Sequence, residues 1–120
     1  EYQGLSMIII TILQIIAVIG TILTGLYSLL APTRIEGFTG IKTIGGRGIT
    51  EVRTIFGGLF IGLGLAAILL DPAVSYPMLG LMYVALAAVR AVSMVVDKSV
   101  ERSNIISLIV EIIFGVILVL

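Results

Sequence analysis

Leu79–Val96 has the sequence LGLMYVALAAVRAVSMVV, an almost wholly apolar stretch with a single charge, Arg90. The apolar stretch Ile105–Leu120, IISLIVEIIFGVILVL, also holds a single charge, Glu111. Apolar stretches of about 17–25 residues are typical of helices that span a bilayer. A charge at the bilayer centre costs roughly 2.5–3.5 kcal/mol on insertion scales, so such residues usually pair, line a cavity or carry function. We therefore predict a membrane protein built around a buried polar cluster.

The composition of the whole chain supports this prediction and excludes several functions. Of the 120 residues, 59% are hydrophobic and 12% are charged, whereas a soluble domain is about half apolar and about one quarter charged. The net charge is zero, so no basic patch indicates a nucleic-acid partner. The chain has no Cys and no His, which excludes disulfides, thiolate catalysis and the commonest metal ligand. We predict no metal, no cofactor and no enzymatic activity.

Four apolar stretches are long enough to span a membrane. The first ends before Pro32, which cannot continue a helix, and the second stops at Asp71-Pro72. Short connections favour antiparallel neighbours, and the chain is too short for a closed barrel of strands. We predict an all-α polytopic membrane protein, a four-transmembrane-helix bundle with antiparallel neighbouring helices. It would form a single domain over residues 1–120, with helices at about 5–30, 49–70, 76–96 and 104–120.

The cations between the predicted helices indicate an orientation. Loops 31–48 and 97–104 contain five Lys and Arg residues, while the connection 71–75 contains none. Loops rich in Lys and Arg stay on the cytoplasmic side of a membrane. We therefore predict cytoplasmic loops 31–48 and 97–104, extracytoplasmic termini, and a location in the bacterial cytoplasmic (inner) membrane.

This topology places three charges at similar depth. Arg90 lies near the cytoplasmic end of its helix and Glu111 near the start of the next, each roughly 9–11 Å from the interface at 1.5 Å per residue. Arg53 lies about one turn into the second helix, from the same side. We predict a buried polar cluster of Arg53, Arg90 and Glu111. Two interpretations remain open: an ion network that fixes helix register, which we favour, and a proton- or ligand-coupled site.

Other residues are predicted to cap or pack the helices. Thr50 is placed to cap the second helix, and Glu51 in its first turn would be favoured there by the helix dipole and would lie at the interface. Small residues let helix backbones approach closely in a membrane, and polar side chains bond across helices. The residues expected to pack helices in this way are Gly57, Gly58, Gly62, Gly64, Gln14 and Thr21.

The stretch Thr50–Gly64, TEVRTIFGGLFIGLG, resembles the signature of an uncharacterised family of four-helix bacterial inner-membrane proteins, known as domain of unknown function 4345. The matching residues are Glu51, Arg53, Phe56, Gly57, Gly58, Gly62 and Gly64, together with Arg90 in the third helix and Glu111 in the fourth. The third loop differs, because Asp97-Lys98-Ser99 lacks the Gly expected after Asp. The resemblance implies a four-helix inner-membrane protein and supplies no activity.

Our leading hypothesis for function is a small integral membrane protein acting as an accessory or structural subunit. Its partners would be the lipid bilayer and a larger membrane protein complex, or further copies of itself in a homo-oligomer. The alternative is a small-molecule, lipid or proton-coupled carrier that uses the Arg53, Arg90 and Glu111 cluster. An intramembrane enzyme is the weakest hypothesis, because without Cys or His the chain offers no nucleophile and base together.

Overall fold

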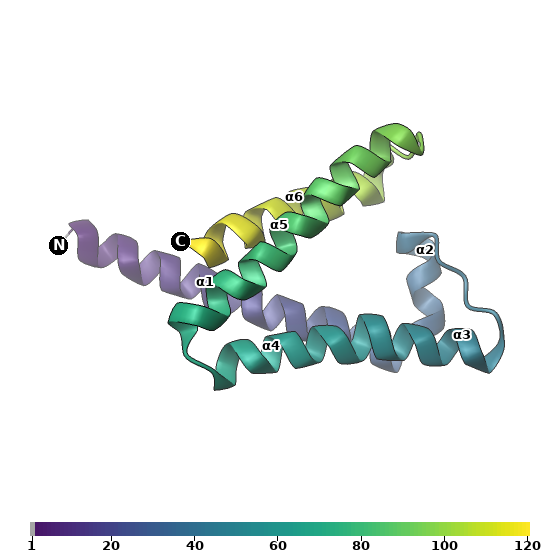
Figure 1. Ribbon diagram of the computed structural model, residues 1–120, viewed down its shortest axis with the longest axis horizontal. Coiled ribbons are helices and arrows are strands. Elements are labelled where there is room, and N and C mark those ends of the chain that lie inside the picture. The colour runs from purple at the N-terminus through teal and green to yellow at the C-terminus, as the bar shows by residue number, and fades with distance from the viewer. Residues whose placement is uncertain (1) are drawn as a thin grey trace. The chain divides into compact units, whose positions relative to one another are not determined.

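The computed structural model describes residues 2–120, and every regular element in this range is helical (Figure 1). Four helical stretches in the described range are long and apolar enough to cross a membrane. The all-α prediction with four candidate spans is confirmed, and the protein is an integral membrane protein. The elements are α1 (Tyr2–Leu30), the 3₁₀ turn η1 (Pro32–Ile35), α2 (Glu36–Thr39), α3 (Gly45–Glu51), the π-helical η2 (Val52–Gly58), α4 (Leu59–Leu69), α5 (Pro72–Val96) and α6 (Arg102–Val119).

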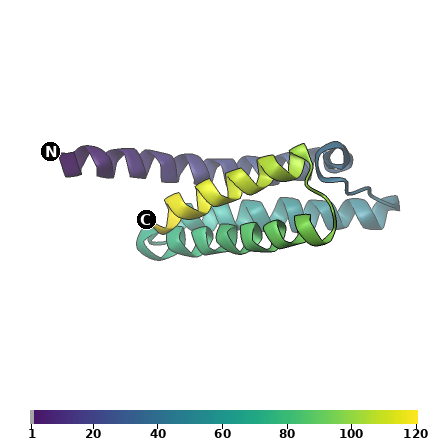
Figure 2. The same ribbon diagram turned by 90° about the horizontal axis from the view of Figure 1, so that it is seen from above.

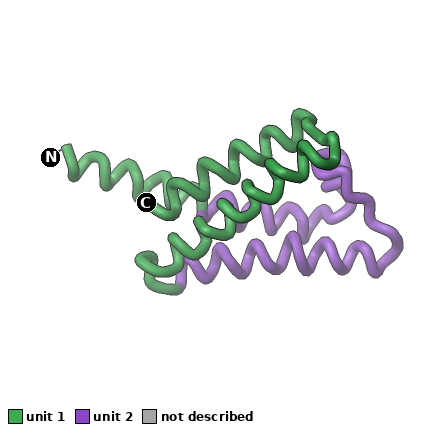
Figure 3. Tube along the Cα trace, turned by 45° about the horizontal axis from the view of Figure 1, so that its top comes forward, with its two compact units in different colours: residues 1–17, 70–120 green, residues 18–69 purple. Residues whose placement is uncertain are grey.

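Chain contacts divide the molecule into two compact units (Figure 3). One unit contains Leu70–Leu120 and the chain up to Ala17, and the other contains Val18–Leu69. The long helix α1 contributes its first half to one unit and its second half to the other. The assignment of the whole chain to a single domain stays a prediction.

Glycines hold the unit Val18–Leu69 together. A Cβ atom built on Gly25 would lie 2.8 Å from the carbonyl oxygen of Gly57, and one on Gly57 would lie 3.2 Å from Cβ of Leu29. A Cβ atom on Gly64 would collide with the side chain of Ile22. As the chain advances from Gly57 to Gly64, the partner on α1 moves back from Leu29 to Ile22, so the two helices are antiparallel. Their backbones pack closely because these positions carry no side chain.

The other two predicted packing glycines do not pack in this way. Gly58 and Gly62 are exposed, and a Cβ atom on Gly62 would meet no described atom within 4 Å. A Cβ atom on Gly58 would meet only the backbone of Arg53, 3.8 Å away on the same helix. Neither glycine therefore makes a close helix contact within its own unit, and a contact of this face with a partner stays a prediction. Gly57 and Gly64 occupy the packed face instead.

The unit with α5 and α6 is built on the same principle. Figure 2 shows the two helices running side by side in opposite directions. A Cβ atom on Gly80 of α5 would lie 3.0 Å from the carbonyl oxygen of Gly115 on α6. One turn away, the rings of Tyr83 and Phe114 meet edge to face, with centroids 5.4 Å apart. Gln14 of α1 donates from Nε2 to the carbonyl oxygen of Ile117, 3.0 Å away, which ties the first half of α1 to α6.

Two helices begin earlier than the sequence predicted. Helix α5 begins at Pro72, not near residue 76, because the Asp71 side chain accepts a hydrogen bond of 3.1 Å from the backbone N–H of Ala73. A proline at the first helical position loses no helical hydrogen bond, so Asp71-Pro72 starts a helix rather than a loop. Pro77, next to the predicted start at residue 76, therefore lies inside α5. Helix α3 begins at Gly45, after an extended Ile44, so the connection predicted as 31–48 ends at Ile44.

The fourth helix also begins before its predicted start at residue 104. Helix α6 starts at Arg102, and the backbone N–H of Ile105 donates to the carbonyl oxygen of Glu101. Asn104, at the predicted start, therefore lies in the first turn of α6. Its side chain is thereby free for the contacts described below.

The close approach at Gly25 predicts a difference between two glycine-to-alanine substitutions. Gly25→Ala should lower the free energy of unfolding by about 1–3 kcal/mol, because the new methyl group must push two backbones apart. Gly62→Ala should be neutral or slightly stabilising, because alanine is the better helix former and has open space there. Thermal unfolding of both purified variants in one detergent measures the difference. Equal stabilities would contradict the glycine contact.

Candidate functional site

The charged residues of α5 and α6 meet in a bidentate ion pair. Arg90 donates from Nε to Oε1 of Glu111 and from Nη2 to Oε2, each over 2.8 Å. The two residues meet because a short connection makes α5 and α6 antiparallel, so a position near the end of one faces a position after the start of the other. Parallel N–H···O bonds of this kind are shorter and stronger than neutral hydrogen bonds.

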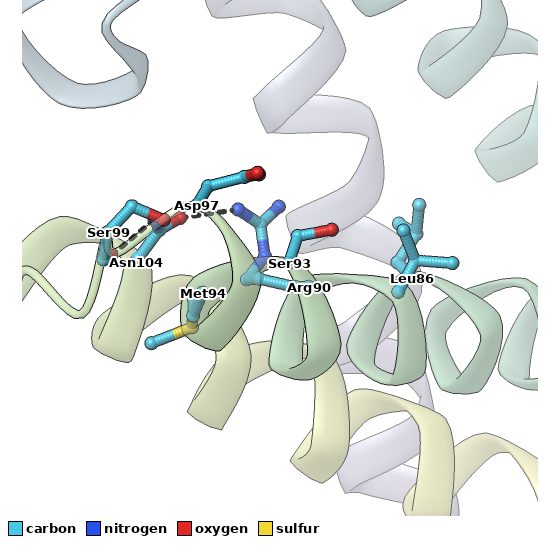
Figure 4. A pocket seen from close by; sticks show the side chains of 8 residues that line it. Leu86, Arg90, Ser93, Met94, Asp97, Ser99 and Asn104 are labelled. Atoms are coloured by element: carbon cyan, nitrogen blue, oxygen red, sulfur yellow. Dashed lines mark hydrogen bonds between the residues drawn. The ribbon is translucent and has the colours of Figure 1, made fainter.

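Asn104 extends the ion pair to the connection between the helices. Its Oδ1 accepts a hydrogen bond of 2.9 Å from Nη1 of Arg90. Its Nδ2 donates to the carbonyl oxygen of Ser99 over 2.9 Å and to Ser99 Oγ over 3.3 Å. Figure 4 shows these bonds along one end of the helix pair. The network thus runs without a break from the interior of α6 through α5 to the connecting loop.

The two charges differ in their access to the surroundings. The Glu111 side chain is 8% exposed and that of Arg90 is 32% exposed. The carboxylate therefore lies inside the helix pair, and the guanidinium covers it and reaches the surface. Among the described residues, every buried side-chain nitrogen and oxygen has a hydrogen-bond partner. Such a network, with every buried polar atom hydrogen-bonded, can hold two helices in register. A shift of either helix would leave a charge without its partner in a medium of low dielectric constant.

Arg53, the third residue of the predicted cluster, differs from the expectation of burial. Its side chain is exposed, and its Nε donates over 3.1 Å to the carbonyl oxygen of Leu29. Leu29 lies in the last turn of α1, where carbonyl groups lack helical partners. A long arginine side chain can reach such a group while its charge stays near the surface. Whether Arg53 also joins Arg90 and Glu111 stays a prediction.

The predicted cap at Thr50 and Glu51 is wrong. Both residues lie at the end of α3, well after the helix begins at Gly45. Glu51 accepts a hydrogen bond of 2.6 Å from Nη1 of Arg47, one turn earlier, and both side chains are more than half exposed. An i,i+4 ion pair on a surface contributes little to stability. Of the remaining predicted packing residues, Thr21 is buried in the second half of α1.

The structure adds a feature that sequence reasoning missed. Residues Val52–Gly58 form a π-helical segment, in which the N–H of Leu59 donates to the carbonyl oxygen of Thr54, five residues earlier. Such segments are rare and occur frequently at functional sites. The only signal in the sequence is Gly57-Gly58, because paired glycines weaken the preference for an ordinary α-helix.

A pocket of about 320 Å³ lies beside the ion pair (Figure 4). Its polar lining comes from the end of α5, the connecting loop and the start of α6: Arg90, Ser93, Asp97, Ser99 and Asn104. Sequence reasoning missed Ser93 and Asp97, although their spacing of three and seven residues from Arg90 puts all three on one helix face. Within residues 2–120, no group of three or more His, Cys, Asp or Glu side chains could hold a metal ion.

Comparison with known proteins identifies one family. Its model matches residues 9–120, nearly the whole chain, and is described as domain of unknown function (DUF4345). The chain has no significant match to a curated protein or to a solved structure.

The geometry of the ion pair predicts a strong energetic coupling. Arg90→Leu and Glu111→Leu should each lower the free energy of unfolding by about 3–5 kcal/mol, because each leaves a charge without its partner. The double variant should recover part of this loss. A double-mutant cycle on the purified protein measures the coupling.

The exposed pair of Arg47 and Glu51 supplies the control. A cycle of Arg47→Leu and Glu51→Leu should give a coupling of about 0–1 kcal/mol, because solvent or lipid headgroups screen both charges. Additive effects at Arg90 and Glu111 would mean that the two side chains do not meet in the protein.

Proposed function

The chain belongs to the DUF4345 family, and we propose that it is a small integral membrane protein acting as an accessory or structural subunit. Its helices pack against lipid and against a larger membrane complex. The function of the family is not established, so the proposal rests on the geometry of this chain.

The observation that carries the proposal is the open glycine face at Gly58 and Gly62. These two residues are exposed and lie four positions apart, and a Cβ atom on Gly62 would meet no described atom. A glycine inside a helix costs about 0.5–1 kcal/mol relative to alanine. In a membrane this spacing of small residues suits the close approach of another helix. Close packing of a partner protein's helix against Gly58 and Gly62 would offset this loss of stability.

The closed polar network supports the same role. Arg90 and Glu111 bind each other through two hydrogen bonds, and Asn104 ties them to the loop. An ion pair that is fully engaged fixes the relative position of two helices, which a structural subunit requires. The carrier alternative would need the cluster to bind and release a substrate during transport while the bonds between Arg90 and Glu111 hold the two helices together.

We place the protein in the cytoplasmic (inner) membrane of a bacterium, with residues 31–44 and 97–101 on the cytoplasmic side and both termini outside. The support is the distribution of cations: Arg34, Lys42, Lys98, Arg47 and Arg102 lie in these two connections or at the helix starts that follow them. The connection between α4 and α5 carries no cation. This asymmetry is the usual determinant of orientation.

The subunit proposal predicts an effect of Gly62→Leu on assembly. In native membranes the protein should run in a particle much larger than its 12.7 kDa, and Gly62→Leu should release it from that particle by filling the glycine face. Size analysis after extraction in a mild detergent measures this. Ile9→Leu, at an exposed apolar position of α1, is the matched control and should leave the particle intact. A protein that runs alone before any substitution would refute the subunit role.

The orientation predicts opposite labelling of two single cysteines. The chain contains no Cys, so Leu70→Cys and Val100→Cys each introduce the only thiol, at exposed positions of the second and third connections. A membrane-impermeant thiol reagent added to intact cells should label the cysteine at residue 70 and not that at residue 100. The reverse pattern would contradict the orientation and leave the number of spans unchanged.

A further inference from the structure

The pocket beside the ion pair contains a guanidinium that has donors to spare. An arginine side chain has five N–H donors, and Arg90 uses three of them on Glu111 and Asn104. Two N–H groups are therefore left for an acceptor in the pocket. Since the side chain is 32% exposed, an outside group can reach it. Phosphate oxygens are acceptors that arginine binds especially well.

A carboxylate lines the same pocket and has no partner among the described residues. Asp97 follows the last residue of α5 and is exposed, and its side chain forms no hydrogen bond or ion pair within residues 2–120. Figure 4 shows its carboxylate on the same side of the helix as the guanidinium of Arg90. A carboxylate repels a free anion and attracts an ammonium group. The pocket therefore suits a molecule that carries both a phosphate and an amine.

The lining is ordered along α5 in a way that matches a phospholipid. Leu86 and Val89 lie deepest, Arg90 and Ser93 come next, and Asp97 lies at the helix end. The Cα atom of Arg90 lies roughly 10 Å below that of Asp97 at 1.5 Å per residue, and the guanidinium extends toward the loop to reach Asn104. Outward from the bilayer centre, the order is thus apolar, cationic, anionic. A lipid with an aminoalkyl phosphate headgroup presents acyl chain, phosphate and amine in the same order.

We propose that this pocket, lined by Arg90, Ser93 and Asp97, binds the headgroup of a zwitterionic phospholipid with a primary amine. The phosphate accepts hydrogen bonds from the two remaining N–H groups of Arg90, and Ser93 can donate to a further phosphate oxygen. The ammonium group donates to Asp97, and the acyl chains lie along Leu86 and Val89. The ion pair with Glu111 persists, so Arg90 binds the lipid without giving up its structural partner. This site is independent of the accessory role.

Lipid retention by the purified full-length protein tests the proposal. The probes are phosphatidylethanolamine, phosphatidylcholine and phosphatidylglycerol with identical acyl chains, each added to the protein in detergent and measured by native mass spectrometry. Phosphatidylethanolamine should be retained about tenfold more strongly than the other two, because one charge-assisted hydrogen bond separates them. The choline headgroup has no N–H to donate, and the glycerol headgroup has no amine.

Asp97→Asn is the discriminating variant, because it removes the charge at an exposed site and leaves the ion pair intact. It should reduce the retention of phosphatidylethanolamine about tenfold, to the level of the other two lipids. Asp71→Asn, at the exposed start of α5, is the matched control and should leave the preference unchanged. Equal retention of the three lipids by the unchanged protein, or a preference that survives Asp97→Asn, would overturn the proposal.

A soluble competitor separates a lipid from a free metabolite with the same groups. O-phosphoethanolamine in millimolar excess should not displace phosphatidylethanolamine, because it cannot occupy the apolar part of the pocket. Displacement would show that the headgroup alone suffices, and would overturn the lipid as the ligand.

Discussion

Hydrocarbon offers no hydrogen bonds, and the structure of this protein depends on that constraint. Every charge and backbone group within a membrane span must find its partner in the protein. Glu111 lies inside a helix pair, and only a bidentate contact with Arg90 makes its burial tolerable. Asn104 then uses both ends of its amide to continue the network to Ser99. Polar groups thus fix the register at one end of the α5–α6 pair.

Glycine, which has no side chain, is the second feature that holds the helices together. Lipid tails are as apolar as leucine, so apolar side chains give helices little reason to associate in a membrane. Gly25 against Gly57, and Gly80 against Gly115, bring backbone to backbone in the two units. Many van der Waals contacts and short dipolar contacts become available at that distance. Each unit therefore combines an antiparallel pair of helices with a glycine crossing.

The sequence predicted the fold class well, because long apolar stretches have a simple physical meaning in a membrane. It also predicted the meeting of Arg90 and Glu111, since antiparallel neighbours with a short loop put charges of equal depth side by side.

The sequence-based prediction was wrong at positions where a single local contact decides the structure. Asp71 could have ended a loop or capped a helix, and only its bond to Ala73 decides. Gly57 and Gly58 are the same residue type, so the sequence does not show which of them faces α1. The structure shows that Gly57 packs against α1 and that Gly58 is exposed. The position of the Arg53 side chain likewise depends on one contact, its hydrogen bond to the carbonyl oxygen of Leu29.

The π-helical segment Val52–Gly58 affects how the helical stretch Gly45–Leu69 can gain or lose a residue. A hydrogen bond that spans five residues instead of four accommodates one residue more than the same rise of α-helix would hold. Removal of one residue within the segment would restore ordinary α-helical geometry without shortening the part that crosses the membrane appreciably. The parts of the helix before and after the segment would keep their relative orientation, because the wider turn takes up the extra residue within the same rotation. The ion pair of Arg47 and Glu51 would thus keep its direction relative to the contact of Gly64 with Ile22. The widened turn thus tolerates a one-residue change in the length of the chain without altering how the charged end and the packed end of the helix face.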